Sequence, residues 1–131
     1  MIGARHLPTY FRQAAGAGWA LVGDAAHHKD PLAARGIADA FLSAQLLAEH
    51  VLQGWDQNLD QALRRYAADL TCLMRPAAEF NYQLAGLDLP AEQARATWQA
   101  LQAAEQHITA ATARGAKVSA GSAAGSPISC A

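Results

Sequence analysis

Apolar residues recur at helical spacing from residue 32 to residue 114, and this periodicity restricts the fold more than any other feature of the chain. The first segment, 32–53, is apolar around most of its circumference, so we expect other parts of a fold to cover it on several sides. Gly54 supplies its stop, and Asn58 caps a second segment with a clean amphipathic pattern. The apolar positions of this second segment are Leu59, Leu63, Tyr66, Leu70 and Leu73.

Prolines and glycines bound the remaining helical segments. Pro76 should break or kink the second helix, although apolar residues continue as far as residue 87. Pro90 suits the first turn of a third helix, which should end before Gly115. Residues 115–131 are small or polar and bury too little surface to offset the entropic cost of ordering, which predicts a disordered tail. We therefore expect a mainly α fold with three helices.

One short strand is expected ahead of the helices. Trp19 to Val22 form a continuous apolar run between Gly18 and Gly23, which is typical of a strand buried on both faces of a parallel sheet. Because no other segment supplies a convincing neighbour, we expect its partner strands to lie outside this sequence. Residues 1–18 form an irregular arm in this interpretation, with a turn at 16–18. The whole is then a fragment of a larger α/β fold.

Composition limits the classes of partner. Ten Lys and Arg residues against eleven Asp and Glu residues give a net charge of −1. This balance provides no electrostatic footprint for a nucleic acid or an anionic membrane surface. No apolar stretch approaches the roughly 20 residues of a bilayer span, and the first residues lack the pattern of a signal peptide. The sequence predicts a soluble, cytoplasmic protein without nucleic-acid or membrane partners.

The residues after the apolar run suit an anionic, hydroxyl-bearing ligand. Gly23 and Asp24 end the run, Pro31 follows in a turn, and Gly36 opens the first helical segment. A glycine allows close approach to the backbone, and a carboxylate accepts hydrogen bonds from vicinal hydroxyls. The free amides and the dipole at a helix start favour negative charge.

This arrangement resembles the second FAD-binding motif of the flavoprotein monooxygenases, the aromatic hydroxylase family and its oxidoreductase relatives, over roughly residues 9–76. The resemblance implies that Asp24 contacts the ribityl chain of FAD and that Gly23 lets the cofactor approach the backbone. It also implies that Pro31 lies along the flavin face. The helix start at Gly36 and Ile37 would stabilise the anionic reduced flavin. Arg35 departs from the family, in which many relatives carry an uncharged residue, often Gln.

Each of these residues also has a purely structural interpretation. Asp24 suits an Asx turn or a helix cap, Pro31 suits a turn before a helix, and Gly36 relieves crowding where a helix meets a strand. The polar residues 27–30 invite a metal-site interpretation, which we disfavour. Neighbouring histidines on a turn point apart, and no third ligand recurs at helical spacing.

The family's first cofactor motif is missing from the sequence. No GxGxxG turn follows a strand and opens a helix. The resemblance therefore implies that residues 19–114 are the carboxyl-terminal part of an FAD-binding domain that lacks its amino-terminal dinucleotide-binding portion and is inactive alone. The intact enzyme would use NAD(P)H and O2 to oxygenate a small organic substrate. Related epoxidases, halogenases and reductases share the motif, so the reaction type stays open.

A second interpretation comes from a different functional class. A short chain with apolar helix faces also suits a helical interaction module without enzymatic activity, or a decayed fragment of an enzyme. Neither a Ser-His-Asp nor a Cys-His arrangement stands out in the sequence, so we assign no catalytic residue.

Overall fold

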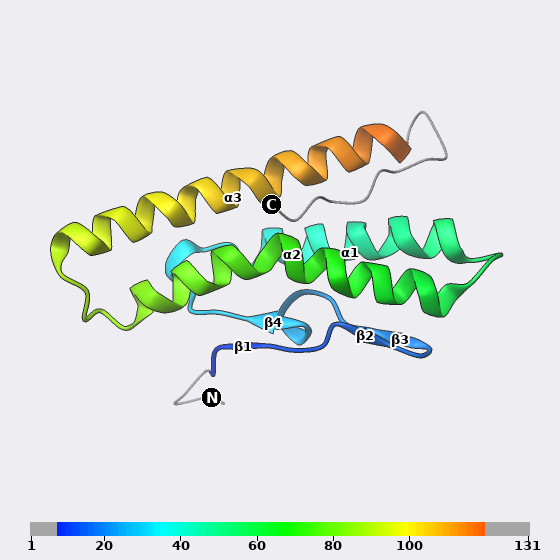
Figure 1. The fold of residues 1–131 in the computed structure, drawn as a ribbon, viewed down its shortest axis with the longest axis horizontal. Helices are drawn as coiled ribbons and strands as arrows, with labels where there is room; N and C mark the ends of the chain where they lie inside the picture. Colours follow the sequence, from blue (N-terminus) through cyan, green and yellow to red (C-terminus); the bar gives the residue numbers. More distant parts are fainter. Residues whose placement is uncertain (1–7, 120–131) are drawn as a thin grey trace, which may run out of the picture.

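Three long helices dominate the fold, as the periodicity predicts (Figure 1). The computed structural model describes residues 8–119, and residues 1–7 and 120–131 lie outside this description. The helices are α1 (Gly36–Gly54), α2 (Leu59–Ala85) and α3 (Ala91–Ser119). α2 packs against both α1 and α3, and the short strands lie along α2 on the side away from α3. None of the helices in the described range is long and apolar enough to cross a membrane.

The second helix supplies most of the core. The side chain of Asn58 accepts a hydrogen bond from the backbone N–H of Gln61 at 3.0 Å, so the predicted cap is confirmed. Leu59 of the predicted apolar stripe is half-buried, and the other four positions are buried. Leu101 and Ile108 of α3 are also buried and complete the core between α2 and α3.

Pro76 does not break the second helix, so of the two expected outcomes, a break or a continuation beyond the proline, the structure has the continuation. The residue is exposed, and α2 continues to Ala85. A proline inside a helix removes one backbone hydrogen bond and crowds the preceding turn. Here the apolar stripe continues in register on both sides of Pro76, with Met74, Ala77 and Leu84 all buried, and this burial favours one continuous helix.

The ends of the other two helices differ from the prediction. α1 begins at Gly36, as the motif predicts, and not at residue 32, where the apolar pattern begins. Residues Pro31–Ala33 form a separate 3-10 helix, η2, which ends where Ala34 adopts a left-handed conformation with φ of 52°. α3 extends past Gly115 to Ser119, so the first residues of the expected disordered tail are helical. The rest of that tail, 120–131, lies outside the described residues.

The expected buried strand is one arm of an antiparallel hairpin instead. β2 (Ala15–Gly16) and β3 (Trp19–Ala20) pair antiparallel across a two-residue turn in which Gly18 has φ of 74°. Trp19 is 46 % exposed, so the run at 19–22 is not a strand buried in a parallel sheet. Its partner is the segment just before it, in which Gly16 pairs with Trp19. The indole of Trp19 lies over Gly16, and a Cβ at position 16 would stand 2.5 Å from the indole Nε1, so only glycine fits there.

The arm before the hairpin is also more regular than expected. β1 (Tyr10–Phe11) pairs antiparallel with β4 (His27–His28), and the backbone N–H of Arg12 donates to the carbonyl of Ala26 at 2.8 Å. The first seven residues of the predicted irregular arm lie outside the described range. Between β3 and β4 the chain forms η1 (Gly23–Ala25), a 3-10 turn that holds two of the expected cofactor residues, Gly23 and Asp24.

Long-range hydrogen bonds fasten these strands and turns to the helices. The hydroxyl of Tyr66 in α2 donates to the carbonyl of Leu21 at 2.6 Å, and the amide of Asn81 donates to the carbonyl of Asp30 at 3.2 Å. Both side chains are fully buried. The position of the turns at 23–33 is therefore set by α2.

One face of α1 stays uncovered, although its composition led us to expect cover on several sides. Leu46 faces the core, whereas Ile37, Phe41, Leu52 and Trp55 are between 67 % and 79 % exposed. The core side of α1 meets α2, α3 and η1. The apolar residues on its opposite side remain open to solvent.

We predict that Tyr66→Phe lowers the free energy of unfolding by about 1–3 kcal/mol, because it leaves the buried carbonyl of Leu21 without its donor. Burial also raises the pKa of Tyr66 from 10.0 to about 12. The contribution of this residue is therefore intact below pH 10 and lost as the pH rises through about 12. Urea unfolding at pH 7 and pH 10.5 tests both statements, with the exposed Tyr82→Phe as the matched control. Equal stability of the two variants would contradict this role.

Candidate functional site

A tight turn at Gly23 packs directly against the first turns of α1. Gly23 is buried with φ of 54°, and its backbone N–H donates to the hydroxyl of Ser43 at 2.8 Å. The same hydroxyl donates to the carbonyl of Ala40 at 3.0 Å. A Cβ at position 23 would lie 3.0 Å from the Cβ of Ala40. Both the left-handed backbone and the close approach to α1 therefore favour glycine here.

The turn places the carboxylate of Asp24 beside the start of α1. One carboxylate oxygen, Oδ1, lies 3.9 Å from the point where a Cβ on Gly36 would stand. Asp24 is exposed, and its carboxylate makes no hydrogen bond within the described residues. Arg35 at the N-cap makes no side-chain hydrogen bond to the helix amides. The first amides of α1 and a free acceptor thus share one solvent-facing corner.

The strand β1 holds the turn from the opposite side. The hydroxyl of Tyr10 donates to the backbone carbonyl of Asp24 at 2.7 Å, so the turn is fixed without using the carboxylate. The guanidinium carbon of Arg12 lies 4.2 Å from the centre of the Tyr10 ring, which is within the range of a cation–π contact. The backbone at Asp24 is therefore held between β1 and α1.

Of the five sequence-predicted site residues, Gly23, Asp24 and Gly36 come together at this corner. Ile37 continues it, and its side chain is 78 % exposed. Pro31 belongs to η2, a different turn, in which the carboxylate of Asp30 accepts from the N–H of Leu32 at 3.0 Å. That turn contacts α2, where the side-chain amide of Asn81 donates to the carbonyl of Asp30 at 3.2 Å.

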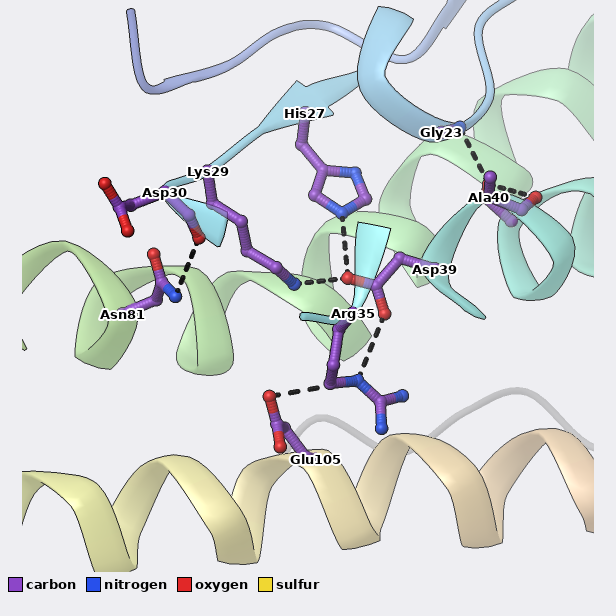
Figure 2. A network of polar contacts seen from close by, with 10 residues as sticks. Gly23, His27, Lys29, Asp30, Arg35, Asp39, Ala40, Asn81 and Glu105 are labelled. Carbon is purple, nitrogen blue, oxygen red and sulfur yellow. Dashed lines mark hydrogen bonds and ion pairs between the residues drawn. The ribbon is translucent and has the colours of Figure 1, made fainter. Parts of the chain in front are cut away.

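Beneath the corner lies a buried carboxylate that the motif analysis did not single out. Asp39 is 2 % exposed and sits in the first turn of α1 (Figure 2). His27 reaches it from β4, and Lys29 reaches it from the segment after β4. Lys29 Nζ forms an ion pair with Asp39 Oδ2, and His27 Nε2 lies 3.8 Å from the same oxygen. Arg35 Nε lies 3.4 Å from Asp39 Oδ1 and 3.8 Å from Glu105 Oε1 on α3.

The two carboxylates of this cluster have opposite electrostatic surroundings. Burial alone would raise the pKa of Asp39, but its contacts with His27 and Lys29 and the charges of Lys29 and Arg35 outweigh burial and lower the pKa. Burial raises the pKa of Glu105, because the charges of Arg35 and Lys29 compensate it only in part and Asp39 adds repulsion. Glu105 Oε1 accepts no hydrogen bond, which agrees with weak compensation.

His27 is a packed residue with one free nitrogen. Its ring stacks on Phe11 at 5.3 Å between centroids, and its Nδ1 has no hydrogen-bond partner although the side chain is 3 % exposed. Across residues 8–119, no three His, Cys, Asp or Glu side chains gather closely enough to hold a metal ion. The polar residues at 27–30 contact different partners. Lys29 forms an ion pair with Asp39, and the Nδ1–H of His28 donates to the carbonyl of Pro8 at 2.9 Å.

A signal for Asp39 was present in the sequence. Arg35 and Asp39 stand four residues apart, the spacing at which side chains of one helix meet. Asp39 is also the one acidic residue in the first half of an otherwise apolar helix. Its partner Lys29 and the more distant Glu105 are brought in by tertiary packing, which no local spacing encodes.

The corner combines two kinds of polar group. Asp24 presents free acceptor oxygens that could bind hydroxyls, and the uncapped amides at Gly36 and Ile37 could bind a group with partial negative charge. Substituting Gly36 would place a Cβ only 3.9 Å from Asp24 Oδ1, in the space between the carboxylate and the helix start. The corner is open to solvent and supplies groups on one side only.

Comparison with known proteins does not extend these observations. The chain matches no protein-family model, and neither a curated protein nor a solved structure resembles it at a significant level. Any functional conclusion therefore depends on the motif at residues 23–37 and on the geometry of the corner.

We predict opposite effects for the two carboxylates of the buried cluster. Asp39→Asn leaves Lys29 and Arg35 without their shared counter-charge and should lower the free energy of unfolding by about 3–5 kcal/mol. Glu105→Gln removes a carboxylate whose charged form is disfavoured by burial, so stability at pH 7 should be unchanged or higher. Urea unfolding of the two variants measures both effects. A loss of stability on Glu105→Gln as large as that on Asp39→Asn would contradict the assignment.

The pH dependence of stability should separate the same two groups. The folded pKa of Asp39 lies below the ordinary value of 3.8 for an aspartate, so its contribution to stability is present above that pH and is lost as the pH falls through the lower folded value. Glu105 has a folded pKa above 4.5, so its contribution is present below that pH and is lost as the pH rises through the raised value. Urea midpoints from pH 3 to pH 8 should rise on mild acidification and then fall. Glu105→Gln should remove the rise alone.

Proposed function

We propose that this chain is the carboxyl-terminal, flavin-contacting portion of an FAD-dependent monooxygenase or related oxidoreductase. The observation that supports the proposal is the meeting of the Asp24 carboxylate with the uncapped start of α1, 3.9 Å from the Cβ position of Gly36. Twelve residues separate these groups in the motif at which the resemblance was recognised. Their juxtaposition is what the flavin interpretation requires.

Each residue of the corner has a role in the proposal. Asp24 accepts hydrogen bonds from the ribityl hydroxyls. Gly23 has no side chain, so the ribityl chain can approach the backbone there. The amides of Gly36 and Ile37 favour negative charge on the pyrimidine side of the reduced flavin. Pro31 borders the flavin face from the neighbouring turn. The bound cofactor supplies the redox and oxygen chemistry.

The rest of the proposed enzyme lies in an amino-terminal dinucleotide-binding portion. That portion would contribute the pyrophosphate-binding turn that the sequence lacks and would close the open side of the corner. In the complete, cytoplasmic enzyme, NAD(P)H and O2 would serve as co-substrates, and a small organic molecule would be oxygenated. The segment described here holds and orients the cofactor and contributes no catalytic residue to the proposal.

We predict weak, saturable flavin binding that depends on Asp24. In ¹⁵N-labelled chain, riboflavin and FAD should shift the backbone amides of residues 23–25 and 36–38. The two ligands should bind with affinities within about threefold, because the adenosine half of FAD has no site here. Asp24→Ala should weaken binding at least about tenfold, the loss of a charged hydrogen-bond acceptor.

Asp56→Ala is the matched control for this experiment. Asp56 is an exposed aspartate just beyond the other end of α1, and no hydrogen bond or ion pair is recorded for it. Its loss should leave flavin binding unchanged. Shifts located away from α1, or equal effects of the two substitutions, would show that the corner is not the flavin site. The absence of any shift at millimolar riboflavin would have the same meaning.

A further inference from the structure

The uncovered face of α1 is a continuous apolar stripe. We call it the α1 stripe. At 100° per residue its members fall within an arc of about 80°, directly opposite the buried Asp39, Ser43 and Leu46. The four large members are between 67 % and 79 % exposed, and the two alanines are also exposed. The α1 stripe consists of Ile37, Phe41, Ala44, Ala48, Leu52 and Trp55.

The order of large and small residues along the α1 stripe is the same from either end. Two large side chains stand at each end, and the two alanines stand at the middle. When two such helices meet antiparallel about a twofold axis near residue 46, Ile37 lies opposite Trp55 of the second copy. Phe41 then lies opposite Leu52, and Ala44 opposite Ala48. The small residues allow the helix axes to approach closely, and the large residues fill the space on either side.

The charge of the α1 stripe also suits a copy of itself. None of its six members is ionisable, so the contact surface of two copies would hold no charged side chain from the stripe itself. A strongly charged partner would need side chains of opposite charge, and the α1 stripe has none. Antiparallel packing also places the positive end of each helix beside the negative end of the other.

The area available comes close to the lower limit of specific interfaces. The α1 stripe spans about 27 Å at 1.5 Å per residue. Phe41 and Trp55 are each more than two-thirds exposed, so the four aromatic rings of a pair would bury roughly 400–700 Å². With Ile37 and Leu52 added, the total approaches the roughly 1,200 Å² at which specific association begins.

We propose that two copies of this chain associate through the α1 stripe as an antiparallel, twofold-symmetric pair. Trp55 of the second copy lies over Ile37 and so borders the uncapped start of α1. The second copy thereby contributes a residue to the edge of the candidate site. The proposal does not rest on the flavin function, because it follows from exposure, register and charge alone.

Sedimentation equilibrium of the full chain without flavin tests the association. Between about 1 and 300 μM, the wild type should approach twice the monomer mass of 13.8 kDa. Phe41→Lys and Leu52→Glu, each alone, should raise the dissociation constant at least about tenfold, because each places two buried charges in the contact. Tyr82→Glu is the control, since Tyr82 is 67 % exposed on α2, outside the α1 stripe, and should leave the dimer intact.

Mixing the two charged variants tests the register. In a mixed pair, Lys at position 41 of one chain faces Glu at position 52 of the other, and the second contact is native, so the dimer should return. Far-ultraviolet circular dichroism checks that each variant keeps its helices, and Ala48→Glu replaces any variant that does not.

Three results would overturn the proposal. A wild type that is monomeric at all concentrations would exclude a second copy as the occupant of the stripe, and larger assemblies would exclude a closed pair. Loss of the dimer on Tyr82→Glu would place the contact elsewhere. A mixture that stays monomeric would exclude the antiparallel register. None of these measurements contains flavin, so their failure is distinguishable from failure of flavin binding.

Discussion

The buried carboxylate of Asp39 is the interaction on which the arrangement of the chain most depends. It joins three parts that are distant in sequence: the segment at His27 and Lys29, the start of α1, and, through Arg35, the third helix at Glu105. Because the carboxylate is almost fully buried, its cationic partners must stay in place to offset desolvation. The geometry of the turn before α1 is therefore fixed both by the ion pairs of Asp39 and by the packing of Gly23 against α1.

The candidate site lies on top of this fixed base. The Gly23 amide and the Ser43 hydroxyl hold the turn to α1, and the Tyr10 hydroxyl holds it from the strand side. These contacts use backbone groups and leave the carboxylate of Asp24 unoccupied by the chain. A rigid backbone with a free acceptor is the arrangement that a binding site needs, since the acceptor is positioned before any ligand arrives.

The sequence predicted the helices well and the tertiary details poorly. Helical spacing identified α2 and its buried face, including Tyr66, because a period of 3.6 residues is a local property. The run at 19–22 was misassigned because a short apolar stretch does not identify the segment with which it pairs, and its partner is β2, Ala15–Gly16. Pro76 left two outcomes open in the sequence, a break or a kinked continuation, and burial of the stripe over the whole helix favours the continuous α2. The corner of Asp24 and Gly36 could be anticipated from the resemblance of the motif, but the ties from Asp39 to Lys29 and Glu105 could not.

The long-range hydrogen bonds between the amino-terminal segment and α2 have a consequence for the order in which the chain folds. Loops of four and five residues join the helices, so α1, α2 and α3 meet through contacts close in sequence, which generally form early. The Tyr66–Leu21 and Asn81–Asp30 bonds close loops of 45 and 51 residues. We expect the helical hairpins to collapse first and the amino-terminal strands to dock onto them last. The ligand-facing corner then exists only once the final step of folding is complete.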